Sequence, residues 1–232
     1  MSKTLIFTAT YNEAGNIAKF LDKFLSLDLS LDILIIDDSS PDETYKIIQK
    51  YSEIHPNIFL HLRKKKLGLD TAHKFAYNYA KKNNYTKLIT LDADLSHDQN
   101  EIPKMINILD NHEFVIGSRY MNGGKCEMSI PRFLLSVIGN KIIKYLLKIS
   151  SDEFTTSFRG FNIIKLNDFN LDMINSKGYS FFMETIFRIH QRKIYIKQIP
   201  IHFKNRSQGK SKIPKIEVIR TLKNLFFLYL NN

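Results

Sequence analysis

The chain has 232 residues, a formal net charge of +11, 44% hydrophobic residues and one cysteine, Cys126. This composition predicts one generous domain with a buried core, and it excludes an intrachain disulfide framework and an extensively disordered chain. The charge favours an anionic partner, such as a phosphorylated small molecule, a membrane surface or a nucleic acid, although Lys-rich chains are often simply basic. The amino terminus turns polar too soon for a signal peptide, and no apolar run of about 18 residues predicts a spanning helix.

The first half of the chain alternates short apolar strands with amphipathic helices. We expect strands over residues 4–10, 32–37, 57–63, 87–94 and 113–119, and helices over residues 13–27, 40–54, 70–84 and 100–111. Strands of this kind are buried on both faces, so the alternation predicts an α/β fold with a mostly parallel sheet and helices on both sides. Ligands of such sheets bind at the carboxyl ends of the strands.

The pattern changes after Tyr120. We expect helices over residues 131–149 and 178–191, strands over 155–165 and 192–204, a basic loop over 205–212, and a final helix within 213–230. Lys141, Lys144 and Lys148 fall along one side of the first of these helices, and Leu and Phe crowd the end of the last. The sequence therefore predicts a main domain over residues 1–212 and a C-terminal amphipathic helix over 213–232.

Acidic and polar residues gather at the ends of four predicted strands, in the stretches TATYNE, IIDDSSPDET, LDADLSH and GSRY. Helix capping explains Ser40 and Asp42, because short polar side chains cap helices, but it explains poorly two aspartates that flank Ala93. Asp92 and Asp94 can converge on one divalent cation, since Mg²⁺ and Mn²⁺ take carboxylate oxygens together with substrate phosphates. We therefore predict a metal site at Asp92 and Asp94.

Seven stretches, in order, resemble the inverting family-two glycosyltransferases of GT-A fold, over about residues 4–212. They are TYNE, IIDDSSPDET, KLGLDTA, LDADLSH, GSRY, TTSFRGF and GYSFFMETI. The nearest branch is that of the dolichyl-phosphate and polyprenyl-phosphate mannosyl- or glucosyltransferases. The resemblance implies a GT-A catalytic domain over 1–212 that uses Mg²⁺ or Mn²⁺. It also implies transfer of one sugar from a nucleoside-diphosphate sugar, GDP-mannose or a UDP-sugar, to polyprenyl or dolichyl phosphate.

The resemblance also implies a donor-binding set by position. This set is Thr10, Tyr11, Glu13, Asp37, Asp38, Lys66, Asp92, Arg206 and Lys212. In such enzymes Tyr11 would pack on the nucleotide base, while Asp37 and Asp38 would contact base and ribose. The segment that holds Arg206 and Lys212 would close over the diphosphate, which would exclude water from the site.

The catalytic residues that the resemblance implies are Asp94, Arg119, Arg132 and Glu184. Arg119 and Arg132 match basic positions near the donor or acceptor phosphate, but Arg119 is equally compatible with an exposed ion pair of little energetic worth. Glu184 matches a carboxylate of the acceptor region. A phosphate acceptor is already ionised at neutral pH, whereas a hydroxyl acceptor needs a general base, for which Glu184 and Asp94 are the candidates.

The chain departs from the family pattern at a few positions, and none of them removes a predicted metal ligand. Asp70 stands where Gly is common, which predicts an altered nucleotide affinity, and Glu153 stands in place of the usual Asp. His97 is interpreted as a helix-entry residue rather than a metal ligand. The chain has no Trp, so the Gln and Arg-Trp signature of processive enzymes is absent and single-sugar transfer is favoured.

The apolar stripes of 131–149 and 213–230 are either core contacts or an interfacial surface with Lys and Arg toward lipid headgroups. We favour membrane contact for the first and leave a homodimer contact open for the second, with a location at the cytoplasmic face of a membrane. Two competing functions are transfer to a hydroxyl of a glycan, lipid or protein, and non-catalytic nucleotide or nucleic-acid binding. Dispersed basic residues and acidic strand ends argue against a nucleic-acid partner.

Overall fold

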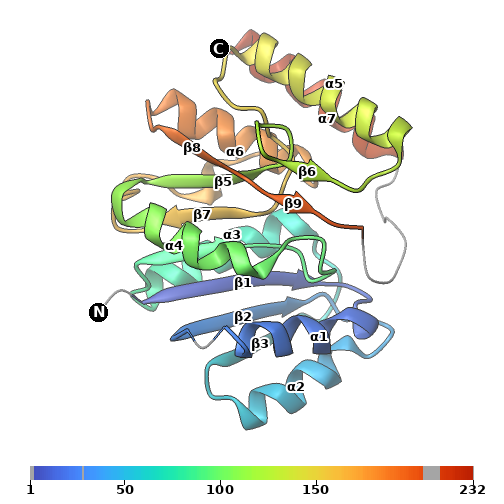
Figure 1. Ribbon diagram of the computed structural model, residues 1–232, viewed down its shortest axis with the longest axis vertical. Coiled ribbons are helices and arrows are strands. Elements are labelled where there is room, and N and C mark those ends of the chain that lie inside the picture. Colours follow the sequence, from blue (N-terminus) through green and yellow to red (C-terminus); the bar gives the residue numbers. More distant parts are fainter. Residues whose placement is uncertain (1–2, 28, 206–214, 232) are drawn as a thin grey trace.

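The computed structural model describes residues 3–27, 29–205 and 215–231. Within them, seven strands form one sheet in the order β3-β2-β1-β4-β7-β5-β8, and β6 pairs with β9 in a short ribbon (Figure 1). The strands are β1 (Thr4–Thr10), β2 (Leu31–Asp37), β3 (Ile58–Leu62), β4 (Lys87–Thr90), β5 (Phe114–Ser118), β6 (Lys125–Cys126), β7 (Arg159–Asn162), β8 (Ile196–Pro200) and β9 (His202–Phe203). In the large sheet only β7 runs antiparallel to its neighbours, so the mostly parallel sheet is confirmed.

Helices cover both faces of this sheet. They are α1 (Ala14–Leu25), α2 (Thr44–Ile54), α3 (Leu69–Lys82), α4 (Ile102–Asn111), α5 (Ile130–Leu147), α6 (Ser180–Gln191) and α7 (Lys215–Leu230), with 3-10 turns η1 (Gln99–Glu101) and η2 (Leu171–Met173). The apolar residues of α1, α2 and α4 share one core cluster, and those of α3, α5, α6 and α7 share the other. The predicted three-layer arrangement follows from these two cores.

Strand β1 shows why the central strands are apolar along their whole length. Leu5 and Phe7 belong to the core on one face of the sheet, and Ile6 between them belongs to the core on the other. All three side chains are 0% exposed. Successive side chains of a strand point to opposite faces, so a strand covered on both sides has no position left for a polar residue until it ends.

Several predicted elements are shorter than expected: the strand predicted over 87–94 ends at Thr90, and the strand predicted over 192–204 is divided into β8 and β9. Two further cases have a clear physical reason. Helix α2 begins at Thr44 rather than at residue 40, because the Ser40 hydroxyl donates to Asp37 Oδ2 at 2.6 Å instead of capping a helix. The strand expected over 155–165 shrinks to β7, because residues 153–157 are held by side chains at the sheet edge. The helix and strand types were predicted correctly, and local polar contacts moved their ends.

Helix α7 packs on the main body of the protein. Leu225 and Leu228 are 4% and 1% exposed in the core shared with α6, and α7 also contacts α5. At its first turn, the Glu217 carboxylate accepts a hydrogen bond from the backbone N–H of Tyr179, 3.2 Å away, just before α6 begins. A carboxylate at this position also complements the positive end of the α6 dipole.

Candidate active site

The pairing of the strands brings their acidic and polar ends to one edge of the sheet. Thr10 at the end of β1 lies beside Asp37 at the end of β2, and Asp37 lies beside Leu62 at the end of β3. On the other side of β1, Phe7 pairs with Thr90, the last residue of β4. The acidic stretches that follow β2 and β4 therefore flank the polar end of β1.

Asp92 and Asp94 form a tight turn directly after β4. The Asp92 side chain is 39% exposed and accepts a hydrogen bond from the Ser157 hydroxyl at 2.7 Å. Asp94 is 4% exposed, and its Oδ1 accepts from both the backbone N–H and the hydroxyl of Ser96 at 3.1 and 2.6 Å. Leu95, between Asp94 and Ser96, has φ +64°, a left-handed conformation that an Asx-type turn accommodates.

His97 is a buried support of this turn that the sequence reading missed. Its Nδ1 accepts from the Asp92 backbone N–H at 3.3 Å, and its Nε2 lies 3.1 Å from the Thr156 hydroxyl. His97 is 3% exposed and directly precedes Asp98, the N-cap of η1, so it lies at a helix entry as predicted and also supports the turn. Burial lowers the pKa of His97 even though Asp92 and Asp94 act to raise it, and a neutral ring is what an accepting Nδ1 requires.

The segment of residues 153–157 supports the site from the neighbouring strand. Thr156 contacts His97, Ser157 contacts Asp92, and the Thr90 hydroxyl donates to the Ser157 carbonyl. Arg159, 1% exposed, fixes this segment by donating to three backbone carbonyls, those of Phe154, Thr156 and Phe182. Burial lowers the pKa of Arg159 to about 9, which still leaves its guanidinium charged at neutral pH.

Arg119 forms a buried, bidentate ion pair with Glu153. The two N–H···O distances are both 2.7 Å, and a third donation reaches the Thr155 hydroxyl at 2.8 Å. The two side chains are 9% and 0% exposed, so the interpretation of Arg119 as an exposed ion-pair residue is wrong. Burial acts to raise the pKa of Glu153, but the adjacent Arg119 charge outweighs it and holds that pKa below its usual range.

On the donor side, Tyr11 and Lys66 lie together. The Lys66 ammonium sits 3.6 Å from the centroid of the Tyr11 ring. Lys66 belongs to the loop between β3 and α3, and that loop is fixed by Asp38. The Asp38 carboxylate pairs with Arg63 at 3.1 Å and accepts from the backbone N–H groups of Leu67 and Gly68, each at 3.2 Å.

Asp37, 0% exposed, is satisfied inside the protein. It accepts from the Thr10 hydroxyl at 2.7 Å and from the backbone N–H and hydroxyl of Ser40 at 2.8 and 2.6 Å. Glu13 lies at the start of α1, where its backbone N–H donates to the Thr44 hydroxyl at 2.9 Å and its Oε2 accepts from Asn16 at 2.7 Å. These contacts join the ends of β1 and β2 to the first turns of α1 and α2.

The other predicted site residues, Glu184, Arg132, Arg206 and Lys212, lie in different parts of the chain. Glu184, 2% exposed, accepts from the Ser176 backbone N–H at 2.8 Å and from Arg188 at 3.0 Å, so its hydrogen bonds join α6 to the preceding loop. Arg132 is exposed in the first turn of α5. Arg206 and Lys212 lie outside the described residues. Lys204, which precedes that segment, donates from its backbone to Ser96 at 2.9 Å.

Asp70, the departure that predicted altered nucleotide affinity, is 7% exposed in α3. Its Oδ1 accepts from the Gly178 backbone N–H at 3.1 Å. The loop before α6 is therefore held by carboxylates from three helices: Asp70 of α3, Glu184 of α6 and Glu217 of α7.

A cavity of about 330 Å³ lies between the end of β5 and α5. Its lining includes Arg119, Tyr120, Phe133, Val137 and Lys141. The Tyr120 hydroxyl is 2.6 Å from the Ser136 hydroxyl of α5, which links the strand end to the helix. The cavity combines cationic groups with an apolar wall, which suits a ligand that is anionic at one end and hydrocarbon at the other.

The donor atoms around Asp92 and Asp94 fit a hard divalent cation that receives further ligands from a diphosphate. Both side chains offer carboxylate oxygens, the ligands that Mg²⁺ and Mn²⁺ prefer. Across the residues that the structure describes, no group of three or more His, Cys, Asp or Glu side chains could hold a metal ion alone. A cation here would depend on substrate oxygens and water to complete its coordination.

The sheet order, the flanking helices and the acidic turn after β4 define an α/β fold of the GT-A class. Residues 5–169 match the family model for glycosyl transferase family 2, and the chain belongs to this family. The undecaprenyl-phosphate mannosyltransferase of Micrococcus luteus is 29% identical over 212 residues, 91% of this chain and 87% of the relative. The polyprenol monophosphomannose synthase of Mycolicibacterium smegmatis is 28% identical over 214 residues, 91% of this chain and 81% of the relative.

Solved structures confirm the GT-A fold. A mannosyltransferase from Pyrobaculum calidifontis in complex with GDP-Man and Mn²⁺ has a TM-score of 0.65 and 18% identity, and the match covers 99% of this chain and 64% of that one. Glucosyl-3-phosphoglycerate synthase from Mycobacterium tuberculosis, in complex with Mn²⁺, UDP and glucosyl-3-phosphoglycerate, has a TM-score of 0.68 and 13% identity over 99% of this chain and 79% of that one. The resemblance seen in the sequence motifs is thereby confirmed for family and fold.

Proposed function

We propose that this protein transfers one sugar from a nucleoside-diphosphate sugar to a polyprenyl phosphate at a membrane surface. The observation that carries the proposal is the Asp92–Asp94 turn at the carboxyl edge of the sheet, beside the cavity that Arg119 lines. The two curated relatives are by name a mannosyltransferase and a monophosphomannose synthase of polyprenyl phosphates, so mannose from GDP-mannose is the first donor to test.

In this proposal Asp92 and Asp94 hold Mg²⁺ or Mn²⁺ against the donor diphosphate. A bound divalent cation supplies positive charge where negative charge grows on the departing nucleoside diphosphate. Tyr11 offers its ring to the base, and Lys66, whose ammonium lies 3.6 Å from the centroid of that ring, offers a positive charge to the donor. Arg206 and Lys212 remain proposed contributors to a segment that closes over the site.

The acceptor phosphate, in this proposal, approaches through the cavity between β5 and α5. Arg119 lines that cavity and Arg132 is exposed in the first turn of α5, so both are proposed to attract the phosphate. A phosphate monoester is already ionised at neutral pH and attacks without a strong base. The contacts of Glu184 with Ser176 and Arg188 support a role in shaping the acceptor side rather than in proton transfer.

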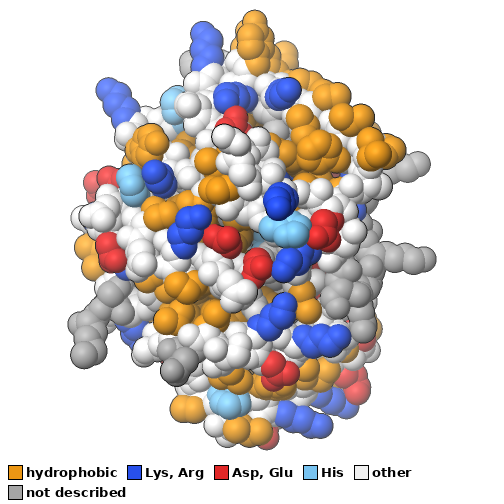
Figure 2. Space-filling view, in the orientation of Figure 1, with side chains coloured by type: hydrophobic (Ala, Val, Ile, Leu, Met, Phe, Trp, Pro, Cys, Tyr) orange, Lys and Arg blue, Asp and Glu red, His pale blue; other side chains and the backbone are white. Residues whose placement is uncertain are grey.

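Membrane contact through α5 and α7 belongs to the same proposal. The two helices touch and expose many large apolar side chains, between 45% and 83%. They are Ile130, Leu134, Leu135, Ile138, Ile142, Tyr145, Ile219, Leu222, Phe226, Phe227, Tyr229 and Leu230. In Figure 2 hydrophobic side chains gather over the region of α5, with Lys and Arg side chains nearby. Contiguous apolar patches of this kind mark interaction surfaces. Along the described residues, no helix is both long and apolar enough to cross a membrane.

The sharpest test is the Asp94→Asn variant, because an amide oxygen can still accept from Ser96 while the charge is lost. We expect sugar transfer from GDP-mannose to a short-chain polyprenyl phosphate to fall at least about 100-fold, with loss of Mn²⁺-dependent GDP binding. Asp168→Asn makes the same chemical change at an exposed position and should leave sugar transfer and GDP binding unchanged.

Three outcomes would overturn parts of the proposal. Equal, metal-independent binding of GDP and UDP by wild type and Asp94→Asn would remove the metal site. Labelling of a hydroxyl acceptor, with no organic-soluble and acid-labile lipid product, would replace the acceptor. Tight, salt-sensitive binding of RNA or DNA without sugar transfer would replace the enzyme class.

A further inference from the structure

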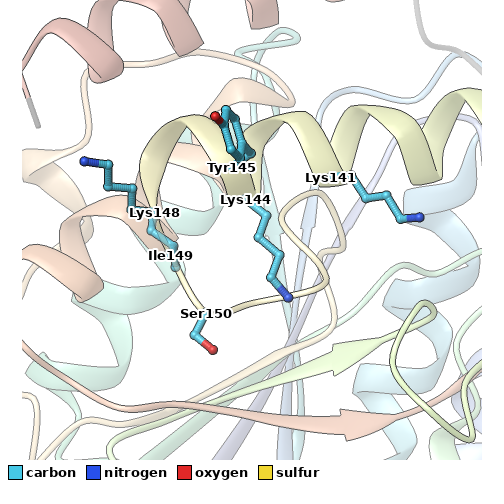
Figure 3. Close-up of a pocket in the computed structure, with 6 residues that line it drawn as sticks. All are labelled: Lys141, Lys144, Tyr145, Lys148, Ile149 and Ser150. Atoms are coloured by element: carbon cyan, nitrogen blue, oxygen red, sulfur yellow. The ribbon is translucent and has the colours of Figure 1, made fainter.

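The C-terminal end of α5 carries a second cavity, of about 480 Å³, beyond the one that Arg119 lines. It is lined by Lys141, Lys144, Tyr145, Lys148, Ile149 and Ser150. Figure 3 shows Lys141 and Lys144 leaving one side of the helix, Tyr145 standing on the other side, and Lys148 at the last turn. Three lysines therefore line one shallow hollow along the end of a helix whose outer face is apolar, and their ammonium groups spread out from it in different directions.

The spacing of α5 sets the lysines beside the apolar face. Leu134, Ile138, Ile142 and Tyr145 recur every three or four residues, opposite the buried Ile143 and Leu147. Lys141, Lys144 and Lys148 follow the same spacing along a neighbouring row. An apolar row flanked by cations is the arrangement that places hydrocarbon in acyl chains and ammonium groups at phosphates.

The charge of this cavity is only partly compensated. Lys144 pairs with Asp152 at 2.7 Å. In the part of the chain that the structure describes, no carboxylate lies within ion-pair distance of Lys141 or Lys148. The cavity therefore carries a net positive charge that an anionic group would complement.

The backbone of Lys148 limits which residues can occupy its position. It ends α5 in the left-handed conformation, with φ +53°, where Gly or Asn is normally preferred. Lysines near a helix end also complement the helix dipole, but any position in the last turn achieves that. Lys193 has the same conformation after α6, so the argument for Lys148 comes from its place in the cavity, and its backbone decides only which substitutions are tolerated there.

We propose that this cavity, defined by Lys141, Lys144 and Lys148, binds the phosphate headgroup of an anionic phospholipid and so orients the enzyme on the bilayer. This inference rests on the proposed membrane contact, and it adds a lipid site next to that of the polyprenyl-phosphate acceptor, whose cavity shares Lys141 and Lys144 and lacks Lys148. The occupant is argued from charge complementarity and from the adjoining apolar row, which continues toward where acyl chains would lie.

The test uses Lys148, because it lines this cavity but not the one near Arg119. Full-length protein is floated with vesicles of phosphatidylcholine alone or mixed with phosphatidylglycerol. Each Lys near an anionic surface contributes roughly a factor of five in binding, so Lys148→Glu should weaken partitioning to the mixed vesicles about 25-fold and Lys148→Asn about fivefold. Asn favours the left-handed backbone at this position, so this variant should fold.

The matched controls are Lys50→Glu and Lys50→Asn, at an exposed position of α2. If the Lys50 variants lose as much vesicle binding as the Lys148 variants, the effect comes from overall charge, and the proposed site is overturned. Binding by Lys148→Glu that equals wild type would overturn it as well. Stable dimers that form without vesicles and disappear in Lys148→Glu would reassign the face to a second copy of the chain.

A second readout gives the position of the helix end in the bilayer. The chain has no Trp, so Tyr145→Trp introduces a single reporter. Brominated phosphatidylglycerol should quench its fluorescence, and unquenched fluorescence on bound vesicles would contradict the orientation.

Sugar transfer in detergent micelles should be unchanged in Lys148→Glu. Loss of transfer there would assign Lys148 to the acceptor site. If wild type transfers no sugar but shows the Lys148-dependent binding, the proposed function fails and the lipid site stands.

Discussion

The ammonium group of Lys66 lies over the ring of Tyr11, with 3.6 Å between Nζ and the ring centroid. The two residues come from different loops, one after β1 and one before α3, and the second is fixed by Asp38. In the proposed function, the ring is where the base stacks and the ammonium is close to the diphosphate. One contact therefore holds together two groups that are proposed to bind the donor.

Lys66→Ala should weaken nucleoside-diphosphate binding by about 10- to 150-fold, because a hydrogen bond to a charged group contributes about 1.5–3 kcal/mol. The free energy of unfolding should change by less than about 0.5 kcal/mol, since Lys66 is exposed. Titration calorimetry with GDP and Mn²⁺ measures the first, and urea unfolding the second. Lys64→Ala, in the same loop, is the control, and equal affinities in the two variants would contradict the assignment.

Glu153→Gln should destabilise the protein by about 3–5 kcal/mol at pH 7, because it leaves the buried Arg119 guanidinium without its counter-charge. Asp152→Asn breaks the half-exposed pair with Lys144 and should change the unfolding free energy by less than about 1 kcal/mol. Urea unfolding compares them. The pKa of Glu153 in the folded protein is held below the ordinary value of 4.5. The loss of unfolding free energy in Glu153→Gln should therefore be complete above pH 4.5 and should shrink as the pH falls through the pKa of the folded protein.

Glu217→Ala should loosen α7 from the main body, because the N–H of Tyr179 loses its acceptor and Arg220 loses its partner. We expect a loss of about 1–3 kcal/mol in the unfolding free energy and faster proteolytic cleavage within α7. Limited chymotrypsin digestion followed by mass spectrometry measures the second effect, because chymotrypsin cleaves after Phe and Tyr, which α7 carries near its end. Lys223→Ala, exposed on the same helix, should behave as wild type. Equal cleavage rates in Glu217→Ala and wild type would show that Glu217 does not hold the helix in place.

His73 makes stability depend on pH in a defined window. Burial, with a smaller contribution from the Arg159 charge, lowers its pKa from 6.5 to about 3. Between these values the unfolded chain binds the proton and the folded protein does not, so this residue makes stability fall as pH falls from 6.5 to 3. His73→Leu should reduce that slope by about 1.4 kcal/mol per pH unit. Urea unfolding between pH 4.5 and 7 gives the slope, and an unchanged slope would contradict a neutral buried ring.

The sequence could predict the helices and strands of the first half because each strand is apolar throughout and each helix has its own apolar stripe. The same pattern placed Asp92 and Asp94 at the end of a strand predicted over 87–94, since a fully covered strand turns polar only where it ends, but β4 ends at Thr90 and both residues follow it. The family was predicted from the seven motif stretches instead, and the family model confirmed it. The boundaries near Ser40 and residue 155 were wrong because side chains from other segments decide where the backbone bends.

Periodicity could not reveal the pairings between distant residues. Arg119 and Glu153 are 34 positions apart, and only β7, inserted antiparallel between β4 and β5, brings the segment before it to Arg119. Burial then turns what looked like a surface ion pair into an internal one. The support of Asp92 by His97 and Ser157 was hidden for the same reason, because no local pattern specifies which polar side chain meets which.

Gly178 shows how a position far from the chemistry can be constrained. Its φ is +60°, and a Cβ built on it would collide with the Glu217 carboxylate. A side chain at 178 would displace the Glu217 carboxylate, which accepts from the Tyr179 N–H, and would strain the backbone at this positive φ. Among relatives that keep this helix, positions 178 and 217 should therefore covary, with a side chain at 178 appearing only where 217 has become smaller.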